Sequence, residues 1–249
     1  MSKYKHPPLD FLMDNPNTKL CSVCGEAKKL SFEHMPPEKS RNDKPINMVG
    51  LENATTYGGY LFNKFTKSPR GFGGYKLCER CNKLTGSWYV NSYIDLSDQL
   101  NKAIDQNLGI NDLDLKCTVK PLNFLKQVLC LMLCSDQANG KLRNILNAKE
   151  LILNREANQI PEEVYISMFP TIQPVPGFKG FMPSWTNING FKNNIEFVFR
   201  PFAFKLTLNE REKGVPEANL ANWKSYDYDE EIEIIFPLKL KHFKSEQYT

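Results

Sequence analysis

Long apolar runs are absent from this sequence. The longest extends from Val128 to Cys134 and has 7 residues, whereas a helix that spans a membrane needs about 20. The N-terminal segment MSKYKHPPLDFLM lacks the apolar core of a signal peptide. The 7 cysteines are an odd number, and without a secretory signal this favours reduced thiols in a cytoplasmic chain with no membrane partner.

The composition is otherwise that of a folded protein. The chain has 249 residues, of which 41% are hydrophobic and 12% aromatic, enough to form a core and to exclude a largely disordered chain. The net charge of +4 is uneven, because residues 1–90 carry 14 Lys and Arg against 8 Asp and Glu, and residues 91–249 carry 18 against 20. The positive half is compatible with a polyanionic partner, although solvated lysines would give the same excess.

Four of the cysteines form two Cys-x-x-Cys pairs, Cys21 with Cys24 and Cys78 with Cys81. Two such pairs supply the four thiolates that tetrahedral Zn²⁺ prefers. We therefore predict a structural zinc site; the alternative is four unrelated buried thiols. Zinc would close the polar loop of 53 residues between the pairs. Metal ligation contributes about 10 kcal/mol or more to the folding of small metal-binding domains, which exceeds the entropy cost of closing such a loop.

Local patterns predict an α+β fold with an irregular arm (residues 1–18), a zinc-binding domain (19–92) and a helical and antiparallel β region (93–249). Apolar residues at helical spacing predict helices over residues 82–89 with a break at Gly86, over 93–106, over 121–134 and from Leu142 to Ile152. Apolar and polar residues alternate in part over 164–169, 195–199, 202–208 and 231–236. These runs predict the strands of an antiparallel sheet with one face on the helices.

The helix over residues 121–134 is predicted to be central and buried, because its second half is apolar nearly all round. Cys130 and Cys134 are four residues apart on it and could share a metal, but no further ligands lie nearby in the sequence. We therefore predict that these two cysteines, and Cys117, are small core residues.

Residues 57–75 combine 5 glycines, 6 aromatic residues and 3 basic residues. Glycines at both ends predict a hairpin or a flap. The aromatic side chains either cover a small zinc-domain core or, with the basic residues, contact nucleic acid by stacking on bases and binding phosphates.

His34 is the histidine with a recognisable context. The chain has only 3 histidines, and His6 and His242 lie in polar terminal segments. His34 follows Glu33 inside the loop between the cysteine pairs, where it could act as a general base toward water. The adjacent carboxylate could bind a second divalent cation that stabilises a phosphodiester leaving oxygen. The alternatives are that His34 caps the first cysteine turn or binds zinc.

Three segments together resemble the zinc-bearing members of the HNH endonuclease family: Cys21-x-x-Cys24, Glu33-His34-Met35-Pro36-Pro37 and Leu77-Cys78-Glu-Arg-Cys81-Asn82-Lys83. The resemblance covers about residues 19–90. The stretch from Cys81 to Tyr89, the Leu-Lys-Gln-Val run and Arg200-Pro-Phe-Ala-Phe are also similar to a group of uncharacterised bacterial HNH-like proteins.

The resemblance implies a zinc treble clef of the ββα-metal kind, with His34 as the general base. It implies that Glu33 and Asn82 bind a catalytic Mg²⁺ or Mn²⁺. The middle asparagine of the family has no counterpart in Gly71-Phe-Gly-Gly-Tyr75, and Asn53 and Asn63 lie farther upstream. By analogy with HNH domains in restriction and mobile elements, it also implies a role in phage defence.

The function predicted from these features is metal-dependent hydrolysis of nucleic-acid phosphodiesters, with DNA as the expected substrate. Phosphate contacts are predicted for Arg70, Lys76, Arg80 and Lys83. One alternative is a non-catalytic zinc module that binds nucleic acid or protein on an inert HNH scaffold. Another is an interaction protein in which residues 93–249 bind a protein partner or a second copy of the chain.

Overall fold

The computed structural model describes residues 20–48, 66–106, 112–136, 140–171, 180–181, 194–208 and 219–239. Within these ranges the chain combines helices with antiparallel strands, as the predicted α+β class requires. In chain order the elements are β1 (Leu30–His34), β2 (Ile46–Met48), β3 (Thr66–Ser68), β4 (Gly73–Cys78), α3 (Glu79–Trp88), α4 (Val90–Gln106), β5 (Asp112–Val119), α5 (Pro121–Ser135), α6 (Lys141–Ile145), α7 (Ala148–Leu153), β6 (Val164–Pro170), β7 (Gly180–Phe181), β8 (Asn194–Phe199), β9 (Phe202–Leu208), the 3₁₀ helix η1 (Leu220–Ser225) and β10 (Ile232–Lys239).

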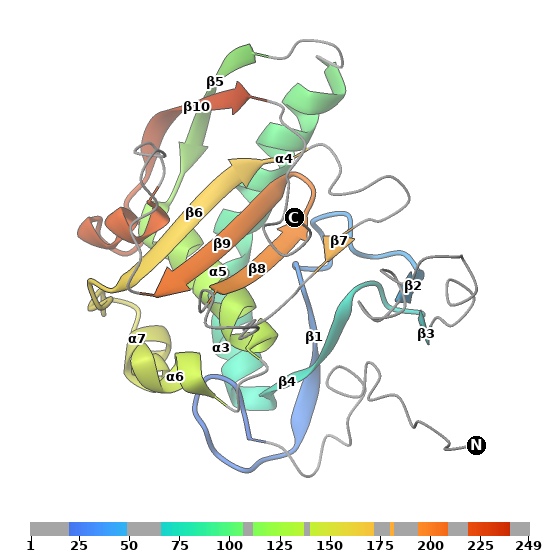
Figure 1. Ribbon diagram of the computed structural model, residues 1–249, viewed down its shortest axis with the longest axis vertical. Coiled ribbons are helices and arrows are strands. Elements are labelled where there is room, and N and C mark those ends of the chain that lie inside the picture. The colour runs from blue at the N-terminus through green and yellow to red at the C-terminus, as the bar shows by residue number, and fades with distance from the viewer. Residues whose placement is uncertain are drawn as a thin grey trace, which may run out of the picture.

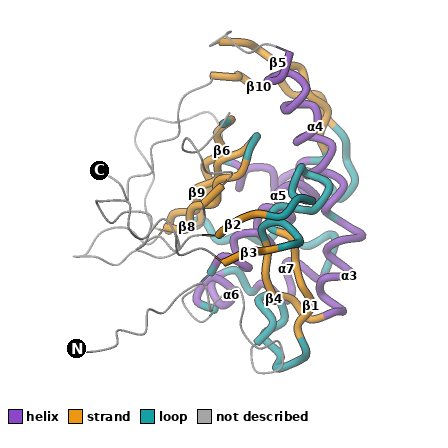
Figure 2. The backbone as a smooth tube through the Cα atoms, turned by 90° about the vertical axis from the view of Figure 1, so that its right-hand side faces the viewer, coloured by secondary structure: helices purple, strands orange, loops and turns teal. Residues whose placement is uncertain are grey.

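Helix α5 lies at the centre of the molecule, between an antiparallel sheet and helix α4 (Figure 1). All 15 of its residues are buried, which confirms the predicted central helix. The sheet has the order β6-β9-β8-β7, and Figure 2 shows it on one side of α5 with α4 on the other. The Phe124 ring on α5 stacks on Tyr93 of α4 at 5.6 Å and meets Phe202 of β9 edge-on at 5.4 Å. The sheet thus has one face on the helices, as predicted.

The strand over residues 231–236 is present, but its partner differs from the prediction. As β10 it pairs with β5, from Ile232 opposite Val119 to Lys239 opposite Asp112, and forms a separate two-stranded sheet. In Figure 1 this ribbon extends above the central sheet, beside α4. The prediction of a single C-terminal sheet is therefore wrong in this respect, because β10 pairs with β5, a strand that precedes α5 in the chain.

Two of the predicted helices also differ from the prediction. Helix α3 continues through Gly86 to Trp88, because Gly86 faces open space and its cost of about 1 kcal/mol in a helix is offset by the packing of the buried side. The region from Leu142 to Ile152 forms two short helices instead of one, separated by Asn147 in the left-handed conformation with φ 45°.

The hairpin or flap predicted over residues 57–75 is only partly described, because residues 57–65 lie outside the described ranges. Its remaining residues supply β3 and the start of β4. These strands pair with β2 and β1, respectively.

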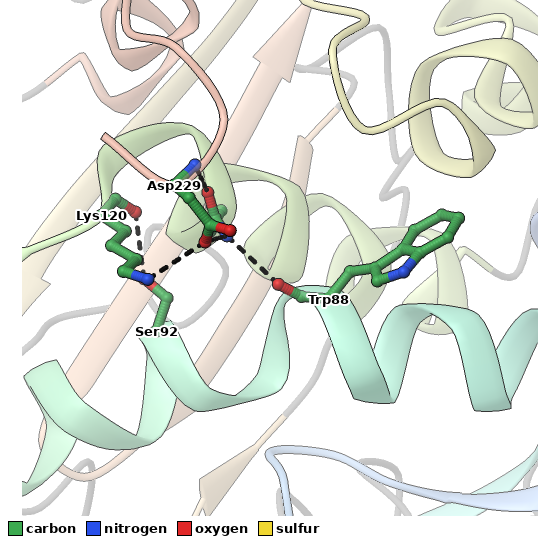
Figure 3. A network of polar contacts seen from close by, with 5 residues as sticks. Trp88, Ser92, Lys120 and Asp229 are labelled. Carbon is green, nitrogen blue, oxygen red and sulfur yellow. Dashed lines mark hydrogen bonds and ion pairs between the residues drawn. The ribbon is translucent and has the colours of Figure 1, made fainter. Parts of the chain in front are cut away.

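A polar network joins the α3–α4 junction to the turn before β10 (Figure 3). The Asp229 carboxylate accepts hydrogen bonds from Lys120 Nζ at 3.1 Å and from Asn123 Nδ2 at 3.0 Å, while its N–H donates to Asn123 Oδ1. Asn123 Nδ2 also donates to the Trp88 carbonyl, and Ser92 Oγ donates to that of Lys120. These hydrogen bonds connect α4, α5 and the turn before β10 to one another.

One continuous apolar cluster includes Cys21, Leu77 and Tyr89 together with Leu96, and extends to Phe204. The described residues of the two predicted regions, 19–92 and 93–249, therefore share a core. Within the described ranges, no helix combines the length and the apolar content needed to cross a membrane.

Candidate metal centre and histidine face

The structure brings the two cysteine pairs together. Cys21 and Cys24 lie in the turn before β1, Cys78 is the N-cap of α3, and Cys81 is in its first turn. The four sulfur atoms all lie within 4.8 Å of one another, and those of Cys24 and Cys78 are 4.0 Å apart. Tetrahedral zinc, with Zn–S bonds of about 2.3 Å, places its sulfur ligands about 3.8 Å apart. The cluster can therefore hold a metal ion, and the alternative of four unrelated thiols is excluded.

Backbone pairing positions this cluster. Strands β1 and β4 are antiparallel, with Leu30 opposite Cys78 and His34 opposite Gly73, so the end of β4 returns to the turn that precedes β1. That turn is closed by Gly25, whose φ of 72° suits glycine. The Ser22 N–H donates to the Lys76 carbonyl at 2.9 Å, and the Cys78 N–H donates to Cys21 Sγ at 3.3 Å.

Cys21 differs in pKa from Cys24 and Cys81 of the same cluster and from the three core cysteines, all of which have raised pKa values. A hydrogen bond from the Cys81 thiol and others from backbone N–H groups lower the pKa of Cys21 to about 5, which favours the thiolate that binds metal. Burial raises the pKa of Cys130 and of Cys134 instead. These two and Cys117 are buried outside the cluster, as predicted for core residues.

His34 lies on a partly exposed surface that we call the histidine face, formed by Phe32, His34, Arg70 and Tyr75. The Phe32 ring meets His34 edge-on at 5.1 Å and Tyr75 at 5.7 Å, and the Arg70 guanidinium lies 5.7 Å from the centre of the Phe32 ring. Gly73, opposite His34, leaves room for this packing, because a Cβ there would come within 2.8 Å of Phe32 Cζ. One histidine, one cation and two aromatic rings are thus grouped on one side of the β1–β4 pair.

Glu33 is placed differently from its neighbour. Successive side chains of a strand point to opposite faces, and Glu33 is only 9% exposed, near Cys130 and Cys134 of α5. Its carboxyl group makes no hydrogen bond or ion pair with any residue in the described ranges. Burial raises the pKa of Glu33 to about 8, so the group is a neutral acid at pH 7.

Replacing Glu33 with glutamine should therefore stabilise the protein in a pH-dependent way. Folded Glu33 keeps its proton up to about pH 8, whereas in the unfolded chain it ionises above its ordinary pKa of 4.5. The wild type consequently loses stability as the pH rises between these values, by at most about 1.4 kcal/mol per pH unit. At pH 8 we expect Glu33→Gln to exceed the wild type by about 2–4 kcal/mol in free energy of unfolding, with the gap shrinking toward pH 5.

Urea unfolding of both proteins at pH 5 and pH 8 measures this difference, in which any titration of the metal ligands cancels. The exposed Glu38 provides the control, because Glu38→Gln should leave stability unchanged at both values. A gap between Glu33→Gln and the wild type that does not vary with pH would contradict the assignment.

Asn82 connects α3 to β1. Its Nδ2 donates to Ser31 Oγ at 3.0 Å and to the Phe32 carbonyl at 3.1 Å, which leaves its side-chain oxygen as the atom available to a cation. Of the cations predicted to contact phosphate, Arg70, Arg80 and Lys83 are exposed, whereas Lys76 is only 9% exposed and lies near Cys134.

Asn42 was not predicted as a site residue, yet it supports the histidine face. Its side chain donates to the carbonyls of Pro36 and Phe72 and accepts from the Phe72 N–H, each at 2.7 Å. Asn42 is 2% exposed, and it fixes the residue before Gly73, the partner of His34. Asn53 and Asn63, the asparagines considered from the sequence, lie outside the described residues. Nothing in the local pattern around Asn42 distinguishes it from other polar loop residues, so only the fold reveals this role.

When the chain is compared with protein-family models, with curated proteins and with solved structures, nothing matches in any of the three.

Proposed function

We propose that the protein is a metal-dependent nuclease of the HNH type that hydrolyses phosphodiester bonds, with DNA as its substrate. The observation that carries this proposal is the histidine face, where His34 and Arg70 flank the Phe32 ring. A general base and a phosphate-binding cation are the two groups that attack on a phosphodiester needs close together. The order of cysteine turn, β1, β4 and α3 around the cluster supports a zinc-bearing treble clef as the scaffold.

In this proposal His34 accepts a proton from a water molecule as the water oxygen attacks phosphorus. The bond from phosphorus to the leaving oxygen then breaks, and Arg70 holds the phosphate through its charge. A bound Mg²⁺ or Mn²⁺ would neutralise the phosphate and stabilise the leaving oxygen, with the Glu33 carboxylate and the Asn82 side-chain oxygen as its proposed ligands. Glu33 points to the face of β1 opposite to His34, so it can serve in this way only from the buried side of the strand and after losing the proton that its burial favours. Zinc in the cysteine cluster would have a structural role, because all four of its positions are taken by thiolates.

Nicking of supercoiled plasmid by the zinc-loaded protein tests the proposal. We expect conversion to the open circular form with Mg²⁺ or Mn²⁺ and none with EDTA added briefly enough to leave the zinc in place. Equal conversion with and without added metal would argue against a metal-dependent nuclease.

The second candidate is a non-catalytic zinc module that binds nucleic acid through the same face. One observation favours it: Glu33 is buried as a neutral acid, on the face of β1 opposite to His34. This module would bind DNA without cleaving it, and Arg70 would be its main phosphate contact.

Both candidates predict that Arg70→Gln weakens DNA binding. Arg70 is exposed, and loss of one phosphate contact should lower affinity for all sequences alike, by about threefold to tenfold, and reduce the slope of log K against log salt by about 1. Fluorescence anisotropy of a labelled duplex at several salt concentrations measures both quantities. Lys102, exposed on α4, provides the matched control: Lys102→Gln should bind as the wild type does. An unchanged slope of log K against log salt in Arg70→Gln would show that Arg70 does not contact the DNA phosphates.

A further inference from the structure

Arg143 of α6 lies against the first cysteine turn. Its Nη1 donates to the carbonyl oxygen of Cys21 at 3.3 Å. The same carbonyl accepts the Gly25 N–H at 2.9 Å, the bond that closes the turn. The Cys21 carbonyl oxygen therefore accepts one hydrogen bond from within the turn and another from a helix more than a hundred residues later in the chain.

Two glycines make room for this guanidinium. A Cβ on Gly25 would come within 3.2 Å of Arg143 Nε, and one on Gly140 would come within 2.4 Å of Nη2. Both glycines have positive φ, 72° and 85°, and Gly140 is also the N-cap of α6. The cysteine turn and the start of α6 are thus both shaped to fit the same side chain.

The contact differs from an ordinary surface ion pair. Among the described residues Arg143 forms no salt bridge, whereas Lys149 on the next helix pairs with the Glu26 side chain at 3.1 Å and is 61% exposed. Arg143 instead binds the backbone of a cysteine of the cluster and is partly buried. Surface ion pairs contribute little to stability. Lys149 is therefore a matched control for Arg143, because both cations lie beside the same cysteine turn.

We infer that Arg143 is a positioning residue of the metal centre. It holds the Cys21–Gly25 turn in the shape that presents two of the four thiolates, and it makes retention of the metal depend on α6. Groups that orient metal ligands from outside the coordination sphere typically change metal affinity by about 10- to 100-fold when they are removed. The inference rests on the cysteine cluster alone and does not require the nuclease activity.

Transfer of zinc to an excess of a chromophoric chelator tests the inference in the full-length protein. We expect Arg143→Gln to release zinc about tenfold faster than the wild type, with an unchanged circular dichroism spectrum. Arg143→Lys keeps the stem and the charge but loses the planar group that fits between the two glycines, so its rate should fall in between. Lys149→Gln should release zinc at the wild-type rate.

Release from Arg143→Gln at the wild-type rate would overturn the inference. Equal acceleration in Lys149→Gln would also overturn it, because any cation near the turn would then suffice. If Arg143→Gln does not fold, Arg143→Lys decides the matter: a rate several-fold above that of the wild type supports the inference, and the wild-type rate contradicts it.

Discussion

Replacing Cys78 with serine is expected to abolish metal binding and to destabilise the whole chain. Cys78 supplies one of the four clustered sulfurs and is the N-cap of α3. Structural zinc contributes about 10 kcal/mol to the folding of small domains, and loss of even about half of this would lower the melting temperature of a chain of this size by about 10–20 °C. The effect should reach the sheet as well, because the apolar cluster around the cysteines continues into it.

Zinc content and thermal unfolding, each measured with and without EDTA, check this expectation. Wild-type protein stripped of metal should melt where Cys78→Ser does, and EDTA should have no effect on the variant. Cys117 is buried to the same degree outside the cluster, so Cys117→Ala is the matched control, which should keep one zinc per chain and lose about 0.5–3 kcal/mol. Cys78→Ser that retains a full zinc complement and the wild-type melting temperature would show that the cluster is not a metal site.

The cysteine cluster could be predicted from the sequence because its signal is local. One Cys-x-x-Cys pair alone would be ambiguous, but two pairs supply the four thiolates of a tetrahedral site, and tetrahedral coordination then requires the pairs to meet. Helix α5 was predictable for a similar reason, since its second half is apolar nearly all round, and this identifies a buried helix without knowledge of its partners.

Strand pairing was harder to predict from the sequence, because it depends on contacts between distant segments. The partner of β10 was missed although β5 carries a regular signal: Leu113, Leu115, Cys117 and Val119 alternate with polar residues. The break predicted at Gly86 does not occur, because Gly86 faces open space and the destabilisation of about 1 kcal/mol by a glycine is offset by the packing of the buried side of α3.

The properties of Glu33 and Asn42 could not be predicted from their neighbours. Glu33 precedes a partly exposed histidine in the sequence, yet it is buried near Cys130 and Cys134 of α5, and this burial raises its pKa. Asn42 acts through backbone groups of Pro36 and Phe72, a role that requires the loop and the start of β4 to be side by side. Buried polar groups of this kind cost stability, and at a functional site such a cost is often retained.

His34→Ala is expected to reduce DNA cleavage by about 10²- to 10⁴-fold, the usual contribution of a general base. His34 contacts the Phe32 ring and is only partly buried, so its removal should leave the fold and the cysteine cluster intact. DNA affinity should also persist, because Arg70 and the aromatic rings remain. A loss of cleavage without a loss of binding separates a catalytic role of His34 from a role in holding the substrate.

The measurement that tests the nuclease proposal most directly is plasmid nicking by the wild type and by His34→Ala side by side, in Mg²⁺ or Mn²⁺, after both proteins have been shown to hold one zinc per chain. The proposal predicts nicking by the wild type and none by the variant over the same period. Equal nicking by both proteins would contradict the assignment of His34. No nicking by either, together with salt-dependent DNA binding that Arg70→Gln weakens, would contradict the nuclease and establish the non-catalytic module in its place.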